Sequence, residues 1–289
     1  LWPSFIQRPY GIVADPQIKP KAIFVSAFAT APLAADIDYT LRDEFDNIQT
    51  GVNAVAKLTD GGVHFSLNGV NFNGTPLHKI ENVIHHTFTG KHPAGNVGVQ
   101  IHHISPVSKG ETVWTISPMM LAAIGKLFNT GKYDVSRKVA VTGPKAIDPA
   151  YVTAFPGMSM TDIADFYDNS ANDIRFISGD VLTGTNVGAE GFLGFFDNQV
   201  TLIKEGNEYE MFGWAKPFRT NLFSASRTYF SWLTPNKKYD MDTNLHGGPR
   251  AFVMSDLYGK VLPMDLYPVH LVKACLAGDI DKMEKFGIY

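Results

Sequence analysis

The sequence predicts an α/β domain followed by an α+β domain, and three observations support this fold class. A mostly apolar run at residues 21–28 precedes a helical stripe and an alternating run at 63–67, which is the order of a β-α-β unit. A second strand and helix follow within residues 112–131. From residue 137 the order changes to two strands, a helix and further strands, which is typical of α+β domains.

Composition and charge narrow the class of protein further. The chain has 289 residues, of which 45% are apolar, so it can bury the cores of two domains. Its formal net charge of −3 provides no basic surface for nucleic acid, which we exclude as a partner. The single cysteine, Cys275, excludes an internal disulfide or a cysteine-ligated cluster and favours a reducing, cytosolic setting.

The sequence has no transmembrane segment by the usual criterion. No apolar run reaches the 18 or more residues that a spanning helix requires, and no basic-then-apolar signal opens the chain. The chain begins at Leu1 without a methionine and stops soon after a predicted helix. We therefore expect a truncated part of a longer protein.

The first predicted domain opens with a buried strand at residues 21–28, bounded by Pro20 and Pro32. A long amphipathic helix is expected over residues 39–58, ending at Gly61 and Gly62 after Asp60. Its apolar stripe consists of Leu41, Phe45, Ile48, Val52 and Val55. The strand at residues 63–67 then lies parallel to the first strand, as β-α-β connections require.

A second strand and helix complete this domain. The strand at residues 112–116 leads into Ser117 and Pro118, an N-cap followed by proline at the first helical position. Gly131 stands where the C-terminal glycine of this helix is expected. Residues 1–136 are therefore predicted to form a Rossmann-like domain.

A β-grasp-like domain is expected over residues 137–214. It contains strands at 137–143, 150–155 and 174–179, with a short helix at 160–167. A hairpin at 199–214, turning at Gly206, is predicted to extend it. Residues 215–289 are interpreted as a connecting segment and the start of a helical region, with a helix at 265–278.

The usual nucleotide-binding pattern is missing from the first domain. A dinucleotide site needs glycines directly after the first strand and a carboxylate after the second. Here "ATAPLAAD" follows the first strand, and "VHFSLNG" ends without a carboxylate. Only Gly95 and Gly98, in "HPAGNVGVQIHH" at residues 92–103, could cradle a phosphate, and an ordinary turn is the favoured alternative.

Five histidines crowd into the same region without the spacing of a metal site. They are His85, His86, His92, His102 and His103. Adjacent histidines on a strand point to opposite faces, so each pair would offer at most one ligand. We predict no metal site and no catalytic residue, because a nucleophile elbow is also missing. A histidine-bound metal enzyme is kept as a third alternative.

Several motifs, taken in order, are similar to those of one family. They are "AIFVSAFATAPLAAD", "HPAGNVGVQIHHISPV", "VWTISPMMLAAIGKLFNTGKYDVSRKVAVTGP", "RFISGDVLTG", "FGWAKP" and "PMDLYPVHLVKACLAGD". Together they span almost the whole chain. The chain thus resembles the NqrA family, which belongs to the sodium-translocating NADH:quinone reductase, the Nqr respiratory complex of bacteria.

This resemblance implies a fold, a location and partners. It implies a Rossmann-like domain, a β-grasp (SLBB-like) domain and the start of a helical C-terminal region. It also implies a peripheral position on the cytoplasmic face of the bacterial inner membrane, attached to the membrane-embedded subunits of the Nqr complex, with NqrB first among them. NADH and ubiquinone would be used by the complex, while no cofactor would be tightly bound in this part of the chain.

One departure from the family pattern decides the expected role. Active relatives carry more glycine and a Glu-Lys pair where Asn96 and Val97 stand between Gly95 and Gly98. We therefore predict a degenerate nucleotide fold that serves as an assembly scaffold. Its remaining cleft is a candidate for quinone contact, formed by Phe28, His92, Gly95, Asn96 and Gly98. The alternative is a flavin- or NADH-binding protein through which electrons enter the complex.

Overall fold

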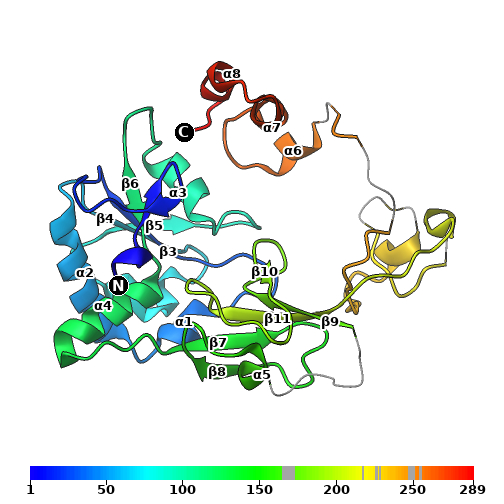
Figure 1. Ribbon diagram of the computed structural model, residues 1–289, viewed down its shortest axis with the longest axis horizontal. Coiled ribbons are helices and arrows are strands. Elements are labelled where there is room, and N and C mark those ends of the chain that lie inside the picture. The colour runs from blue at the N-terminus through cyan, green and yellow to red at the C-terminus, as the bar shows by residue number, and fades with distance from the viewer. Residues whose placement is uncertain (165–172, 217, 225–226, 228, 247–250, 254–255) are drawn as a thin grey trace. The chain divides into compact units, whose positions relative to one another are not determined.

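The computed structural model describes residues 1–164, 173–216, 218–224, 227, 229–246, 251–253 and 256–289. These residues form two compact units. The first contains Leu1–Arg137 and Val253–Tyr289, and the second contains Lys138–Phe252. Each unit holds one β-sheet with accompanying helices (Figure 1). The predicted combination of α/β and α+β folds is confirmed.

The sheet of the first unit has the strand order β2-β1-β6-β3-β4-β5. The strands are β1 (Ile6–Arg8), β2 (Ile12–Val13), β3 (Ile23–Ala27), β4 (Val63–Asn68), β5 (Ile84–Phe88) and β6 (Val113–Thr115). β3 pairs in parallel with both β4 and β6, and β4 pairs in parallel with β5. β1 joins β6 and β2 in antiparallel pairs. The predicted parallel β-α-β arrangement is confirmed.

The long helix predicted over residues 39–58 is wrong, because the chain forms two helices there. They are α1 (Ile37–Leu41) and α2 (Phe45–Val55), followed by the 3-10 helix η2 (Ala56–Leu58). Between them the Glu44 N–H donates to the Leu41 carbonyl at 3.0 Å. The Glu44 carboxylate also accepts from the Asn47 side chain at 2.7 Å. These turn hydrogen bonds replace the continuous helical ladder.

Helices cover both faces of this sheet (Figure 1). On one face, helix α3 (Val97–Ile104) packs Ile101 against Phe24 and Val113. On the other, α2 packs along α4 (Pro118–Thr130). The ends of α4 are as predicted: the Ser117 hydroxyl accepts the Met120 N–H at 3.3 Å, and Gly131 has a φ of 71°.

The second unit has a sheet with the strand order β10-β9-β11-β7-β8. The strands are β7 (Arg137–Thr142), β8 (Ala150–Ala154), β9 (Ile174–Ser178), β10 (Thr185–Asn186) and β11 (Gln199–Lys204). Helix α5 (Met160–Ile163) supplies two buried side chains, Met160 and Ile163, to its core. The predicted helix at 160–167 extends beyond residue 164 into positions outside the described residues.

The hairpin predicted at residues 199–214 is wrong. β11 forms the expected first arm, but it pairs with β9 and β7 instead of with residues 207–214. After Lys204 the backbone N–H of Gly206 donates to the Thr243 hydroxyl at 2.7 Å, and that of Glu208 donates to the Asn244 side chain at 3.0 Å. Side chains distant in sequence thus satisfy the groups that a second strand would have paired.

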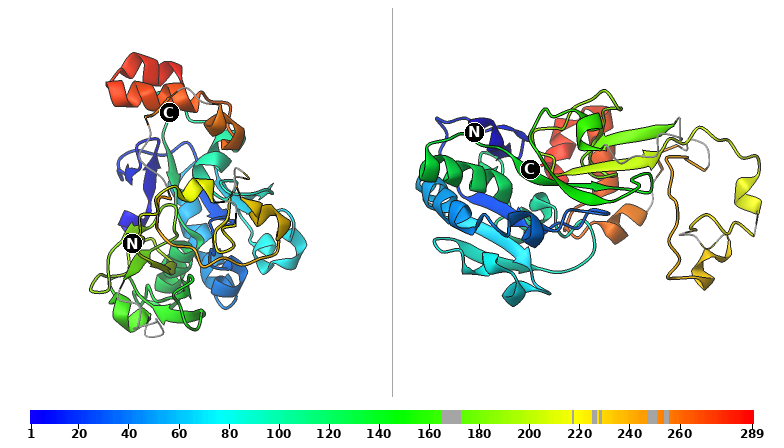
Figure 2. Two further views of the ribbon diagram at one scale, coloured as in Figure 1. Left: turned by 90° about the vertical axis from the view of Figure 1, so that its right-hand side faces the viewer. Right: turned by 90° about the horizontal axis from the view of Figure 1, so that it is seen from below.

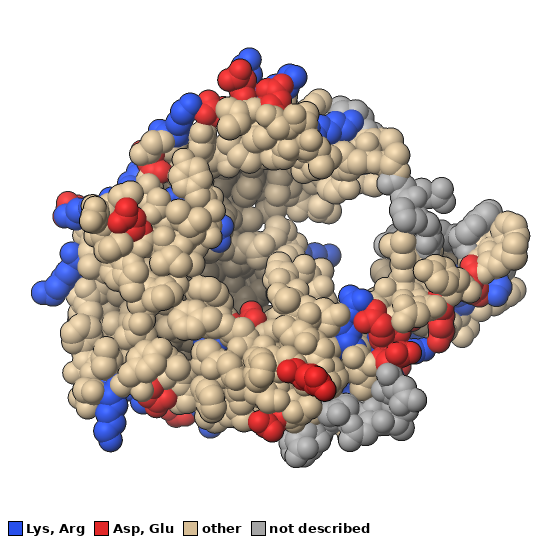
Figure 3. Space-filling view, in the orientation of Figure 1, with Lys and Arg blue, Asp and Glu red and all other residues tan. Residues whose placement is uncertain are grey.

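The C-terminal helices are α6 (Leu257–Val261), α7 (Pro268–Ala277) and α8 (Ile280–Lys285), and they belong to the first unit. Acidic and basic side chains alternate over α8 (Figure 3), and Lys282 pairs with Asp279 at 2.7 Å. The remaining 3-10 helices are η1 (Trp2–Ser4), η3 (Phe72–Gly74), η4 (Pro76–Lys79), η5 (Gly213–Ala215) and η6 (Phe230–Leu233). Among the described helices, none combines the length and apolar character needed to cross a membrane.

Candidate functional site

The predicted loop lies directly against the end of β3. Helix α3 begins after Asn96, which is its N-cap residue, and the preceding Gly95 touches the chain that leaves β3. A Cβ atom added at Gly95 would lie 2.4 Å from the Phe28 carbonyl oxygen and 2.9 Å from the Thr30 backbone nitrogen. Glycine is therefore required at position 95 so that two backbone segments can approach closely.

Thr30 occupies the place that a bound anion would take against this loop. The Gly95 N–H donates to the Thr30 hydroxyl oxygen at 3.0 Å. The same hydroxyl lies 3.2 Å from Nδ1 of His92, and the His92–Pro93 peptide bond is cis. Phe28, His92 and Gly95 are thus brought together, but their polar groups are satisfied by each other and by Thr30.

Two predicted site residues lie outside this contact. Asn96 makes no side-chain cap hydrogen bond to α3, and a Cβ atom at Gly98 would meet nothing within 4 Å. Both belong to the start of α3, where the chain turns away from β3. The five predicted residues are therefore neighbours in sequence and space, but only Phe28, His92 and Gly95 share one contact.

Sequence reasoning missed a buried polar network beneath the loop. Gln100, only 1% exposed, donates from its side-chain nitrogen to the Ser26 hydroxyl at 2.9 Å. Ser26 in turn donates to the Gly95 carbonyl at 3.0 Å. The Gln100 side-chain oxygen is buried and has no hydrogen-bond partner among the described residues. The one available signal was a glutamine standing between the apolar residues Val99 and Ile101 of a helix.

A cavity of about 310 Å³ opens beside this contact, at the ends of β3 and β4. In parallel sheets this is the edge where ligands usually bind. The Thr75 hydroxyl donates to the Asp38 carboxylate across the cavity wall, and Asp36 caps helix α1 by accepting the Tyr39 N–H at 3.1 Å. The lining residues are Ala27, Phe28, Ala29, Ala34, Ala35, Asp36, Ile37, Asp38, Leu67, Asn68, Asn71 and Thr75.

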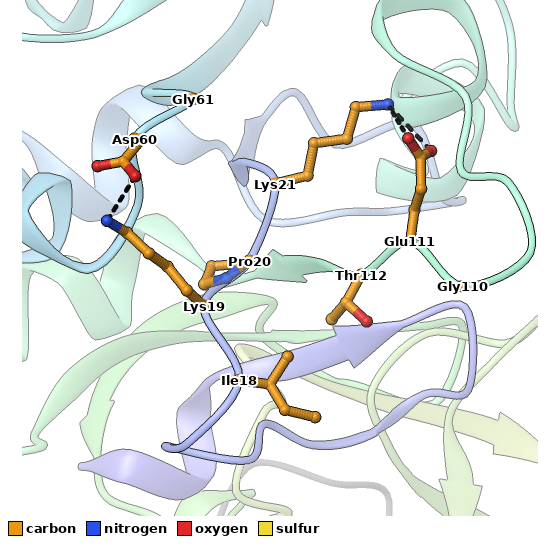
Figure 4. A pocket seen from close by; sticks show the side chains of 9 residues that line it. All are labelled: Ile18, Lys19, Pro20, Lys21, Asp60, Gly61, Gly110, Glu111 and Thr112. Atoms are coloured by element: carbon orange, nitrogen blue, oxygen red, sulfur yellow. Dashed lines mark hydrogen bonds and ion pairs between the residues drawn. The ribbon is translucent and has the colours of Figure 1, made fainter.

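A second cavity, of about 400 Å³, lies at the opposite edge of the sheet (Figure 4). Its two lysines are already paired: Lys19 with Asp60 at 2.6 Å and Lys21 with Glu111 at 3.0 Å. Because this edge precedes the strands β3 and β4, it is not the usual ligand edge of a parallel sheet. We therefore take the cavity beside Phe28 as the candidate site.

The clustered histidines are used mainly for local hydrogen bonds. His85 and His86 point to opposite faces of β5, as predicted: His85 bonds to the Ile80 carbonyl at 2.9 Å, and His86 Nε2 lies 2.8 Å from His64 Nδ1. Burial, followed by the neighbouring histidine, lowers the pKa of His64 and of His86. His102 and His103 lie on helix α3, so the strand argument does not apply to this pair.

The described residues contain no group of three or more His, Cys, Asp or Glu side chains that could hold a metal ion. The site also fits a dinucleotide or flavin phosphate poorly. The Gly95 N–H already has Thr30 as its partner, and two carboxylates, Asp36 and Asp38, line the adjacent cavity. Carboxylates next to a phosphate would repel it.

Comparison with known proteins gives consistent matches along the chain. Residues 1–133 match the family model described as the NqrA second alpha/beta domain, and residues 138–189 match the model described as the NQRA C-terminal domain. The chain is 38% identical, over 289 residues, to the NqrA protein of the Na(+)-translocating NADH-quinone reductase from Rhodopirellula baltica. It is 37% identical, over 288 residues, to the protein of the same name from Yersinia pestis.

The matches cover this chain fully but its relatives only in part. The alignment with the Rhodopirellula baltica protein takes in 100% of this chain and 63% of the relative. The corresponding shares for the Yersinia pestis protein are 99% and 64%, and for the Alcanivorax borkumensis protein, which is 37% identical, 99% and 63%. The chain therefore spans less than two thirds of the length of these relatives.

Proposed function

Because this chain belongs to the NqrA family, we propose that it acts as an assembly scaffold in a sodium-translocating NADH:quinone reductase. The complex would oxidise NADH, reduce ubiquinone and export sodium ions. This chain would sit on the cytoplasmic face of the bacterial inner membrane, bound to membrane-embedded subunits, with NqrB as the first candidate. The relatives' shared name, a lettered subunit of such a reductase, supports the proposal.

The observation that carries the scaffold role is the contact between Gly95 and Thr30. A nucleotide-binding loop of this fold holds phosphate with free backbone N–H groups. Here the Gly95 N–H donates to a side chain of the same protein, 3.0 Å away, and the Gly95 carbonyl accepts from Ser26. The loop therefore stabilises the fold with the groups that would otherwise recognise a ligand.

Titration of the purified chain with NADH and with FMN tests this role. We expect no saturable heat of binding up to millimolar ligand and no NADH oxidation by the chain alone. Saturable binding at micromolar concentration, lost in a folded Gly95→Leu variant, would contradict the scaffold role. A Gly98→Leu variant is the control for bulk added to the loop, since position 98 has open space around it.

The rival function is electron entry through a chain that binds flavin or NADH. One observation favours it: the backbone N–H groups of Val97 and Gly98, in the first turn of α3, have no hydrogen-bond partner among the described residues. Such groups can bind an anion at a helix N-terminus. The same titration decides between the two functions, because only the rival predicts binding that depends on ligand phosphate.

We also propose that the cavity beside Phe28 contributes to a quinone site. A quinone ring presents an apolar face and two carbonyl acceptors, and this cavity combines alanine methyl groups with the Asn68 and Asn71 amides. Titration with ubiquinone-1, a short-chain quinone, should shift the NMR signals of these two amides. Ala29→Trp, a change at an exposed residue of the rim, should abolish the shift. Equal shifts in both proteins would contradict the proposal.

A further inference from the structure

The first unit ends its sheet with an open strand. β5 (Ile84–Phe88) pairs with β4 along one side, and it is the last strand in the sheet order (Figure 2). No described segment pairs with its other side. An unpaired strand edge presents a row of backbone donors and acceptors that can join another chain.

The register shows which backbone groups point outward. Phe88 is the partner of Asn68, and the Gly69 N–H donates to the Phe88 carbonyl at 2.9 Å. In a parallel pair, the residue that accepts such a bond turns both its N–H and its C=O toward the neighbouring strand, and this orientation alternates along the chain. Ile84, His86 and Phe88 therefore bond to β4, while His85 and Thr87 present their N–H and C=O groups outward.

The side chains of β5 do not protect this edge. Sheet edges are commonly blocked by lysine, proline, a bulge or a very short strand. β5 has five residues, "IHHTF", without proline or a permanent charge, whereas the strand at the opposite edge, β2, has only two. Ile84 is 47% exposed and Thr87 is also exposed. β5 thus has the features of an edge that accepts a partner.

We propose that the β5 edge binds an extended segment of a partner protein in the complex, which adds a strand to the sheet. The inference rests on the proposed function, because it requires a multi-subunit complex. The outward groups of His85 and Thr87 would make at most four backbone hydrogen bonds. A contact this small cannot hold two free copies of the chain together, but it can position a segment of a protein that is bound elsewhere in the same complex.

The side chains indicate what kind of segment fits. Ile84, His86 and Phe88 share one face of the strand, so the incoming segment would place apolar residues opposite Ile84 and Phe88. His86 Nε2 is engaged with His64, which leaves Nδ1 to bond a polar residue between them. The expected partner segment therefore alternates apolar, polar and apolar residues on this face.

The test compares Thr87→Pro with Thr87→Val in the assembled complex. Proline removes the outward N–H of residue 87 without removing any bond to β4, and valine keeps it. We expect Thr87→Pro, and Thr87→Lys with its added edge charge, to weaken retention of this chain in the complex by about tenfold or more. Thr87→Val should behave as the wild type. Equal urea midpoints of the isolated variants show that each chain is folded.

A photo-crosslinking amino acid at position 87 identifies the occupant. In the intact complex it should link to one extended segment of a partner protein. If the wild-type chain assembles but all three variants are retained equally and no partner crosslink forms, the edge proposal is overturned while the proposed function stands. A crosslink only to a second copy of this chain would also overturn it. If the wild-type chain does not assemble, the proposed function itself fails.

Discussion

Gly95 and Gly98 are three residues apart and meet different surroundings. The Phe28 carbonyl oxygen would lie 2.4 Å from a Cβ atom at position 95, while a Cβ atom at position 98 would have no neighbour within 4 Å. Gly95 is thus required by the close approach of two backbones, and Gly98 lies in a helical turn with room for a side chain. The spacing of the two glycines does not by itself indicate a phosphate site.

Alanine at each glycine should therefore have opposite effects. We expect Gly95→Ala to lower the free energy of unfolding by about 1–3 kcal/mol, because the added methyl group overlaps backbone atoms. Gly98→Ala should raise it by up to about 1 kcal/mol, since alanine favours a helix. Urea denaturation of the two variants measures both changes. Equal destabilisation would contradict the packing explanation for Gly95.

The His64–His86 pair makes stability sensitive to mild acid. Burial lowers the pKa of each ring below the ordinary value of 6.5, so the folded protein binds fewer protons than the unfolded chain. Above pH 6.5 both states are neutral at these rings, and the pair contributes its full stability. As the pH falls below 6.5, protons bind preferentially to the unfolded chain and this stability is lost.

A double variant, His64→Gln with His86→Gln, should remove this component. Urea midpoints at pH 7.5, 6.5 and 5.5 are the measurement, and the wild type should lose more stability on acidification than the variant. His270→Gln is the matched control, because His270 is an exposed histidine on α7. An unchanged pH profile in the double variant would show that other groups cause the acid sensitivity.

At the scale of elements, helices α2 and α4 approach so closely that their backbones touch. A Cβ atom at Gly125 of α4 would lie 1.7 Å from the Asn47 carbonyl oxygen, and one at Gly51 of α2 would lie 2.1 Å from the Leu121 carbonyl oxygen. Each helix thus carries a glycine where the other crosses it. This contact sets the distance between two helices on the same face of the sheet.

Gly125→Ala should push the two helices apart. We expect it to lower the free energy of unfolding by about 3 kcal/mol, at the upper end for overpacked sites, because backbone atoms cannot rotate away as side chains do. Gly259→Ala is the control, since Gly259 lies in helix α6 with nothing within 4 Å of an added Cβ atom. Thermal unfolding measures both. A small effect of Gly125→Ala would mean that α2 and α4 can separate at little cost.

At the scale of the molecule, the two units have separate hydrophobic cores. The second core contains Val139, Phe176, Val200 and Leu202, all within the second unit. Phe24, Ile101 and Val113 belong to the core beneath α3 in the first unit. A defect in one core should therefore destabilise mainly its own unit.

Leu202→Ala tests this separation. Leu202 is fully buried, so the truncation should cost about 2–5 kcal/mol within the second unit. Hydrogen exchange followed by mass spectrometry should show faster exchange in β7, β9 and β11 and unchanged exchange in β3 and β4. Faster exchange in both units would show that they unfold together.

Local features of the chain were largely predictable. The strands at 21–28, 63–67 and 112–116 were found from runs of apolar residues, and the ends of α4 from Ser117 and Gly131, because periodicity and capping depend on residues close in sequence. The candidate loop was located for the same reason, since two glycines flanked by histidines form a local pattern. The break between α1 and α2 was missed because the apolar stripe continues across it.

The sequence by itself determined the two-part fold class and the membership of the chain in its family. Only the tertiary structure decided what the loop at 92–98 does, because Thr30, 65 residues before Gly95, supplies its hydrogen-bond partner. The same holds for the His64–His86 pair and for the second arm that β11 lacks. Each depends on side chains that meet only after folding, and no local pattern in the chain records which distant groups will become neighbours.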